Sequence, residues 1–359
     1  MGGALDKFQN ILNTTTNAAA SIALLREAAT AERAGVRAAQ RIAEVHALLG
    51  ADMAVVDREL QRATRDGMSP ATDSATHLLE AGGKRVRPLT VLLSAACFGA
   101  VPAAAREVAV AAELVHLATL LHDDVVDDGQ ERRGKPTPRR LWGNAVSVLA
   151  GDLLLTHALE RTAAAAPGAV LGDLFATLRR LVDGEIVQLR GRTRLEAREE
   201  VYFRIVHDKT ASLFAWAARA GAATGGAPPE AVAALGEFGA RVGVAFQLVD
   251  DVLDYDGDPR ATGKALLGDL IEGKLTLPLL RTLAARPALF DDVDAVRAGD
   301  EIAAGRVAEA VRASGACEGV RALAREETVR AERALEAVPA CAAREMLCSI
   351  AAELATRAA

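Results

Sequence analysis

The pattern Asp-Asp-x-x-Asp occurs twice in the sequence, and each copy closes a long apolar stretch. The first copy is Asp123-Asp124-Val-Val-Asp127, and the second is Asp250-Asp251-Val-Leu-Asp254. Residues 108–121, which lead into the first copy, contain neither proline nor glycine and are too long for a typical strand. Each copy is therefore predicted to end a buried helix, where residues i and i+4 lie on one face and three carboxylates share one patch of surface.

Three carboxylates in one patch repel each other, and the repulsion costs stability unless a cation neutralises it. Magnesium suits such a patch because it takes oxygen ligands, usually one or two carboxylates completed by water and phosphate oxygens. A single acidic cluster is explained equally well as a solvated helix end. Two copies with the same spacing favour another interpretation, in which two helices face each other across a cavity and hold several Mg²⁺ ions and a diphosphate.

A basic segment, Gly82-Gly83-Lys84-Arg85-Val86-Arg87-Pro88, opens another apolar stretch. Two glycines let backbone N–H groups approach an anion, and three cations within four residues can surround a phosphate. The alternative is a helix C-cap followed by solvated basic residues. Because the chain also carries two acidic clusters suited to Mg²⁺ and a diphosphate, the phosphate-binding interpretation is favoured.

The composition indicates an all-helical protein, because the chain is rich in alanine, only 3% aromatic, and shows no strand pattern. The formal net charge of −6 argues against nucleic acid as a partner. The four cysteines lack metal-type spacing and are predicted to be small core residues of a reduced, cytoplasmic protein. No signal-peptide pattern is evident, and no apolar run approaches the roughly 20 residues that span a bilayer.

Taken together, these stretches resemble the trans-isoprenyl diphosphate (polyprenyl) synthases, from about residue 48 to residue 278. The segments that match in order and spacing are residues 82–88, Asp123 to Asp127, Arg132-Arg133-Gly-Lys, Lys209-Thr210, Gln247 with Asp250 to Asp254, and Gly263-Lys264 through Lys274-Leu-Thr-Leu-Pro. One departure is Leu267, which stands where the family usually has a glycine two positions before Asp269.

The resemblance implies an all-α fold: a single-domain antiparallel helical bundle around a central cavity, of the isoprenoid synthase type I kind, usually as a homodimer. Residues 48–359 are expected to form this catalytic domain. Residues 1–47 are expected to form a helical N-terminal extension that carries no site.

The implied activity is a Mg²⁺-dependent, head-to-tail trans condensation of isopentenyl diphosphate with an allylic diphosphate. Thr210 and Gln247 would face the allylic cation as neutral dipoles. The six aspartates that would hold Mg²⁺ against the allylic diphosphate are Asp123, Asp124, Asp127, Asp250, Asp251 and Asp254. The cations that would neutralise the departing diphosphate are Arg132, Lys209, Lys264 and Lys274. The residues that would bind isopentenyl diphosphate are Lys84, Arg87, His116 and Arg133.

Product length is predicted from the helix that precedes Asp123. A helix rises about 5.4 Å per turn, which is close to the length of one extended isoprene unit. The first turn back from Asp123 offers Ala118 and Thr119, and the next offers Leu114 and Val115. Because none is aromatic, a long-chain, octaprenyl-type product is predicted. Geranylgeranyl or farnesyl diphosphate is the alternative, if a plug from Leu154, His157 or Ala158 closes the tunnel early.

Other functions fit the sequence less well. Glu113-x-x-His116 matches half of a helical di-iron site, which needs a second copy that the sequence lacks. A His122-Asp123 phosphohydrolase site would leave the second acidic motif without a role. A class I terpene cyclase would not be expected to carry Lys84 and Arg87 or a complete second motif. An inactive scaffold subunit would be expected to have lost some of these charges. A transient membrane contact for product release is compatible with the prediction.

Overall fold

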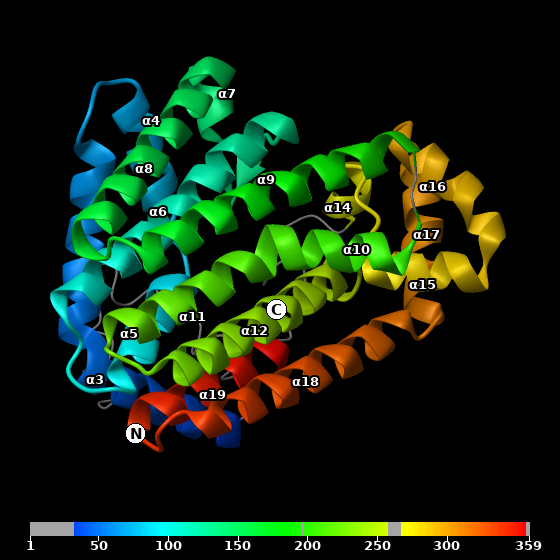
Figure 1. Ribbon diagram of the computed structural model, residues 1–359. Coiled ribbons are helices and arrows are strands. Elements are labelled where there is room, and N and C mark those ends of the chain that lie inside the picture. Colours follow the sequence, from blue (N-terminus) through cyan, green and yellow to red (C-terminus); the bar gives the residue numbers. More distant parts are fainter. Residues whose placement is uncertain (1–31, 195–196, 258–266, 357–359) are drawn as a thin grey trace. The chain divides into compact units, whose positions relative to one another are not determined.

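The computed structural model describes residues 32–194, 197–257 and 267–356, and nearly all of its regular structure is helical (Figure 1). Among these residues the strands are β1 (Glu131–Arg132) and β2 (Lys135–Pro136), which form one short antiparallel ladder. The all-α prediction is therefore confirmed, and the short hairpin is a small exception to it. Most of the predicted N-terminal extension, and Lys264 of the predicted site, lie outside the described residues.

The chain forms two compact units. Unit 1 runs through Leu171 and takes in Ala220–Pro228 and Ala340–Leu347. Its elements besides the hairpin are α3 (Glu32–Arg65), α4 (Ala71–Glu80), α5 (Val86–Ala96), α6 (Ala103–Val126), α7 (Pro138–Trp142) and α8 (Asn144–Ala165).

Unit 2 consists of Gly172–Arg219, Pro229–Pro339 and Cys348–Ala359. Helices α9, α11 and α19 each begin in one unit and end in the other. The elements after α8 are α9 (Ala169–Arg194), α10 (Glu199–Ile205), η1 (Val206–Ala211), α11 (Ser212–Thr224), α12 (Pro229–Asp256), α14 (Gly268–Ile271), α15 (Leu277–Ala285), η2 (Pro287–Leu289), α16 (Phe290–Arg297), α17 (Glu301–Ala313), α18 (Ala316–Ala334), η3 (Leu335–Ala337) and α19 (Ala342–Thr356).

Helix α6 is the central helix of unit 1 and ends in the first acidic motif. It packs against α5 and α8, and its residues from Val108 to Val115 are all buried. Apart from Glu113, which pairs with Arg85, this stretch is apolar on all sides and must be covered on all sides, which explains the central place of α6. The helix stops because Asp128 adopts a left-handed conformation (φ +54°), and the Gly129 N–H then bonds to the Asp124 carbonyl at 2.9 Å.

Helix α12 has the equivalent role in unit 2 and carries the second acidic motif. It packs against α18 and η1, and glycines allow a close approach of its backbone to the preceding helical segments. A Cβ at Gly243 would lie 2.6 Å from the Cα of Ala211. Among the described residues, α12 is also the one helix that passes a test of length and hydropathy for crossing a membrane. Because more than half of its apolar window is buried, a core helix explains this result equally well.

A π-helical segment, η1, interrupts the helical run from Glu199 to Thr224. It holds Lys209 and Thr210 between α10 and α11. A π turn changes the backbone hydrogen-bond pattern, and such turns are frequent at functional sites. Arg180 supports the segment from α9, donating to the His207 carbonyl at 3.1 Å and to the Asp208 carboxylate at 2.8 Å.

Gly239→Ala is expected to lower the thermal unfolding midpoint. The added Cβ would lie 2.8 Å from the carbonyl carbon of Phe214 and 2.9 Å from the Cα of Ala215, so α12 would have to shift away from α11. Overpacking of this kind costs about 1–3 kcal/mol. Gly305→Ala on α17 is the control, because no atom lies within 4 Å of its added Cβ. That change should be neutral or slightly stabilising, since alanine favours a helix by roughly 1 kcal/mol over glycine. Equal midpoints for both variants would contradict the close approach.

Candidate active site

The first acidic motif places two half-exposed carboxylates beside one that is buried. Asp123 and Asp127 are half-buried, whereas Asp124 is 2% exposed. The same Asp124 oxygen accepts from Arg132 Nε at 3.0 Å and from Arg132 Nη2 at 2.8 Å. The hairpin that contains Arg132 therefore connects directly to the end of α6.

The position of this motif is electrostatically unfavourable without a cation. The C-terminal end of a helix carries a partial negative charge, and carboxylates placed there are repelled by it. Asp123, Asp124 and Asp127 all lie in the last turn or cap of α6, with the Asp127 N–H bonded to the Asp123 carbonyl at 2.8 Å. Arg132 compensates Asp124. A divalent cation bound to Asp123 and Asp127 would reduce the repulsion further.

The second acidic motif repeats this arrangement in unit 2. Asp251 is 1% exposed and accepts from the Tyr202 hydroxyl at 2.6 Å and from Gln247 Nε2 at 2.7 Å. Burial raises the pKa of Asp251 well above its usual value, and the charge of Asp269 raises it further. Asp250 and Asp254 are half-buried. The Asp254 carboxylate also accepts from the backbone N–H groups of Gly268 and Asp269, at 2.9 and 3.3 Å.

Both motifs thus share one design, in which the central aspartate is buried and hydrogen-bonded while the outer two are half-exposed. No three acidic, histidine or cysteine side chains among the described residues converge closely enough to enclose a metal ion by themselves. The outer aspartates offer carboxylate oxygens, the donors that a hard cation takes one or two of while water and phosphate oxygens complete its shell. The donor set fits Mg²⁺.

Polar side chains from η1, α12 and α10 form a chain that ends on Asp251. The Thr210 hydroxyl donates to Gln247 Oε1 at 2.8 Å, and Gln247 then donates to Asp251. Lys209 forms an ion pair with Glu185 of α9, and Lys274 forms one with Glu272 at 2.5 Å. Unit 2 therefore brings together the predicted residues Thr210, Gln247 and Asp251. The sequence contained no signal for Tyr202 or Glu185.

A cationic cluster lies in unit 1 around the segment that precedes α5. Burial lowers the pKa of Arg87 to about 10, and Glu113 opposes this effect. Burial likewise lowers the pKa of Arg133. A Cβ added at Gly83 would lie 3.2 Å from Arg133 Nη1, so the bare glycine backbone packs against this guanidinium.

His116 belongs to the same cluster and is neutral at pH 7. Burial lowers its pKa well below the usual value, and the charges of Arg87 and Arg133 lower it further. The predicted residues Arg87, His116 and Arg133 therefore act on one another electrostatically. A cluster with this excess of positive charge is suited to an anion, and it disfavours a metal cation at Glu113-x-x-His116.

One part of the sequence interpretation needs correction. Three cations were expected to surround a phosphate, but Arg85 is 2% exposed and forms an ion pair with Glu113 at 2.7 Å. It has a left-handed conformation (φ +49°) and precedes α5 as its N-cap residue. Lys84 is half-buried on the segment just before it. Arg85 is thus a structural residue of this segment, and Glu113 is its partner.

The predicted chain-length positions lie on α6. Leu114, Val115 and Ala118 are at most 2% exposed, and Thr119 is half-buried. The Thr119 hydroxyl donates to the His116 carbonyl at 2.7 Å. Of the proposed plug residues, Leu154 and Ala158 are fully buried in unit 1, and His157 Nε2 lies 2.8 Å from the Asp66 carbonyl oxygen.

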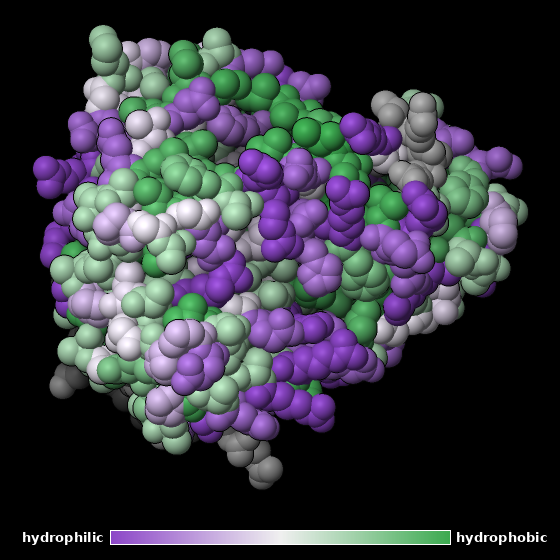
Figure 2. Space-filling view, viewed as in Figure 1, coloured by the Kyte–Doolittle hydropathy of each residue, from purple (hydrophilic) through white to green (hydrophobic). Residues whose placement is uncertain are grey.

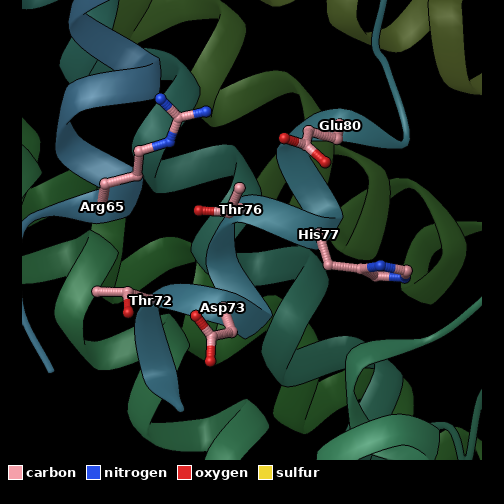
Figure 3. A pocket seen from close by; sticks show the side chains of 6 residues that line it. All are labelled: Arg65, Thr72, Asp73, Thr76, His77 and Glu80. Atoms are coloured by element: carbon pink, nitrogen blue, oxygen red, sulfur yellow. The ribbon is translucent and has the colours of Figure 1, made fainter. Parts of the chain in front are cut away.

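An open pocket of about 470 Å³ lies along α4 and the end of α3 (Figure 3). Its lining contains none of the predicted site residues. The side chains labelled in Figure 3 are Arg65, Thr72, Asp73, Thr76, His77 and Glu80.

Comparisons with known proteins agree with this geometry. Residues 69–313 match the sequence profile of the polyprenyl synthetases. Heptaprenyl diphosphate synthase component 2 of Geobacillus stearothermophilus is 40% identical over 245 residues, which cover 68% of this chain and 76% of that protein. Nonaprenyl diphosphate synthase of Mycobacterium tuberculosis is 42% identical over 240 residues, covering 66% of this chain and 71% of that protein.

A solved structure shows the same fold. The polyprenyl synthase of Caulobacter crescentus CB15, crystallised with calcium and isoprenyl diphosphate, is 38% identical with a TM-score of 0.84 and covers 88% of this chain and 98% of that one. The fold and the sequence matches define the class of protein as a trans-prenyltransferase. Within that class, the chain belongs to the polyprenyl synthetase family.

Proposed function

We propose that this protein condenses isopentenyl diphosphate with an allylic diphosphate, head to tail and in trans, to build a long-chain polyprenyl diphosphate with Mg²⁺ as cofactor. The observation that carries the proposal is the cationic cluster of unit 1. Arg87, Arg133 and the neutral His116 act on one another there, and Glu113 is already paired with Arg85. A cluster of guanidinium groups with this geometry is suited to bind an anion of high charge, such as a diphosphate.

The outer aspartates of the two motifs are the proposed metal ligands. Asp123 and Asp127 in unit 1, and Asp250 and Asp254 in unit 2, are half-exposed carboxylates at helix ends. Mg²⁺ bound there would stabilise the negative charge that develops on the departing diphosphate. The sequence predicts Asp124 and Asp251 as further Mg²⁺ ligands. Because both are buried and already accept hydrogen bonds, they are proposed instead to hold Arg132 and Gln247 in place.

The remaining residues complete the chemistry of ionisation, attack by the isopentenyl double bond, and proton loss. The cations proposed to neutralise the allylic diphosphate as its bond to carbon breaks are Lys209, Lys274 and Arg132. The same role is predicted for Lys264, which lies outside the described residues. Lys84, Arg87, Arg133 and His116 are proposed to bind the diphosphate of isopentenyl diphosphate. The Thr210 hydroxyl donates a hydrogen bond to Gln247. These two neutral side chains are proposed to stabilise the allylic cation through their dipoles without reacting with it.

One assay tests the proposal. The protein is incubated with Mg²⁺, radiolabelled isopentenyl diphosphate and a panel of allylic diphosphates, and the products are sized by chromatography. Elongated prenyl diphosphates are expected. A cyclic hydrocarbon formed without isopentenyl diphosphate would indicate a terpene cyclase, and no conversion would contradict the proposed function.

A long-chain product is proposed because no phenylalanine, tyrosine or tryptophan side chain stands on the first two turns of α6 before Asp123, and because relatives carry the names heptaprenyl and nonaprenyl diphosphate synthase. Geranylgeranyl diphosphate is the alternative. Ala118→Phe is expected to shorten the product sharply while the first condensation proceeds, because the ring would block the path along α6.

Ala51→Phe is the control for this variant, because Ala51 is exposed on α3 of the same unit. Its product should match that of the wild type. Thermal unfolding of both variants shows whether the buried phenylalanine is tolerated. A wild-type product that already stops at geranylgeranyl diphosphate would refute the tunnel along α6 while leaving the chemistry intact.

A homodimer is proposed as the working assembly. Phe175, Val182, Ile186 and Leu189 are large apolar residues of α9 that are 37–58% exposed, and their spacing places them along one side of the helix. Hydrophobic side chains also lie among hydrophilic ones on the face shown in Figure 2. Light scattering in solution tests the assembly. The Geobacillus relative is named component 2 of its enzyme, so assembly with a second, different chain is the alternative outcome.

A cytoplasmic location stays a prediction.

A further inference from the structure

A buried carboxylate, Asp57, lies behind the cationic cluster and has no role in the chemistry described above. It belongs to α3 and is 5% exposed, and neither of its oxygens has a hydrogen-bond donor among the described residues. Its closest charged partner is Arg85, whose Nε lies 3.7 Å from Asp57 Oδ1. A buried carboxylate without a hydrogen bond costs stability, so it requires an explanation other than stability.

The side chain between Asp57 and the cluster is Arg85. Its Nη1 donates to Glu113 Oε1 of α6 at 2.7 Å, and Glu113 is 3% exposed. Asp57, Arg85 and Glu113 therefore connect α3, the N-cap of α5 and α6 through one buried guanidinium. Arg85 is itself left-handed, a conformation that is uncommon for a residue with a side chain and must be held by its surroundings.

The segment that Arg85 fixes carries two proposed substrate ligands. Lys84 precedes it, and Arg87 follows it in the first turn of α5. A Cβ at Gly83 would lie 2.9 Å from Arg85 Nη1, so the glycine backbone also lies against this guanidinium. Displacing Arg85 would thus move the backbone on both sides of it.

We propose that Asp57, Arg85 and Glu113 form a positioning triad, which holds Lys84 and Arg87 in the geometry that binds the diphosphate of isopentenyl diphosphate. The inference rests on the proposed function and adds to it three residues that do not touch substrate. The triad acts on the affinity for isopentenyl diphosphate, because the segment it holds contributes ligands to that substrate alone.

The ionisation of Asp57 gives the triad a pH dependence. Burial raises the pKa of Asp57 to about 6, with Arg85 opposing and Glu113 adding to the shift. Above about pH 6 Asp57 is ionised, and Arg85 has two anionic partners. Below it Asp57 is neutral, and Glu113 alone remains as the anionic partner. Affinity for isopentenyl diphosphate should therefore fall as the pH drops through about 6.

The test compares Asp57→Asn with Asp52→Asn, the same change on the same helix. Asp52 pairs with Arg106 at 2.6 Å and takes no part in the triad. In the wild-type background, Asp57→Asn should raise the KM for isopentenyl diphosphate about tenfold, the lower end of the range for groups that orient a ligand-binding residue. It should leave kcat and the KM for the allylic substrate near wild type. Asp52→Asn should change none of the three.

The pH profile separates positioning from a general loss of stability. The wild type and Asp52→Asn should share an inflection near pH 6 in 1/KM for isopentenyl diphosphate, over and above the titration of the substrate, and Asp57→Asn should lack it. Glu113→Gln, as a second variant, should raise the same KM. Identical KM values and profiles for the two asparagine variants would overturn the triad while wild-type turnover upholds the proposed function. A wild type that forms no elongated product would instead refute the function and this inference with it.

Discussion

Replacing Asp123 or Asp250 by alanine is expected to reduce turnover several hundredfold. Each is an outer, half-exposed aspartate of its motif and is proposed to bind Mg²⁺. Loss of one group that stabilises the charge of the transition state costs about 3–4 kcal/mol, which is roughly two to three orders of magnitude in rate. The measurement is kcat with saturating substrates and Mg²⁺.

Neighbouring aspartates provide the controls for these two variants. Asp128 is exposed and pairs with Arg139 at 2.8 Å directly after the first motif, and Asp256 is exposed and pairs with Arg321 at 3.0 Å directly after the second. Asp128→Asn and Asp256→Ala remove the carboxylate charge from positions with a local partner, and asparagine tolerates the left-handed backbone of residue 128. Turnover of both variants should stay within a few-fold of wild type. Near-normal turnover of Asp123→Ala and Asp250→Ala, or full activity in a chelator, would refute the metal assignment.

Replacing Arg87 by alanine should raise the KM for isopentenyl diphosphate by roughly 10- to 100-fold and alter the KM for the allylic substrate much less. A hydrogen bond to a charged group contributes about 1.5–3 kcal/mol, and about 1.4 kcal/mol corresponds to a factor of ten. Arg87 belongs to the buried cationic cluster of unit 1, which is proposed to bind the diphosphate of isopentenyl diphosphate and not that of the allylic substrate. Initial rates with each substrate varied in turn measure the two constants.

Arg140→Ala is the matched control for Arg87→Ala. Arg140 is exposed on α7 of the same unit, and its nearest acidic partner is Glu131 at 3.5 Å. Loss of this cation should leave both constants unchanged. An equal rise of both KM values in Arg87→Ala would show that the two diphosphates do not use separate sites.

The helices that carry the acidic motifs could be predicted from local sequence. Residues 108–121 were predicted as a helix, and α6 runs from Ala103 to Val126. Prolines followed by an acidic residue, as in Pro228-Pro229-Glu230, are a helix-start signal, and α12 begins at Pro229. These predictions succeed because apolar periodicity, proline placement and i/i+4 spacing are properties of one segment and do not depend on what packs against it.

The sequence by itself therefore determined the class of fold, the two helices that end in acidic motifs and the order of motifs that identifies the family. The partners of buried charges were decided only by tertiary structure. Asp124 is matched with Arg132, Asp251 with Tyr202, and Arg85 with Glu113, across separations of 8 to 49 residues. The sequence does not show whether a charged side chain is solvated or buried, because its partner belongs to a different element that packing brings within about 3 Å. For the same reason Asp57, an unremarkable aspartate of α3 in the sequence, became a candidate for positioning substrate only once α5 and α6 were in place around it.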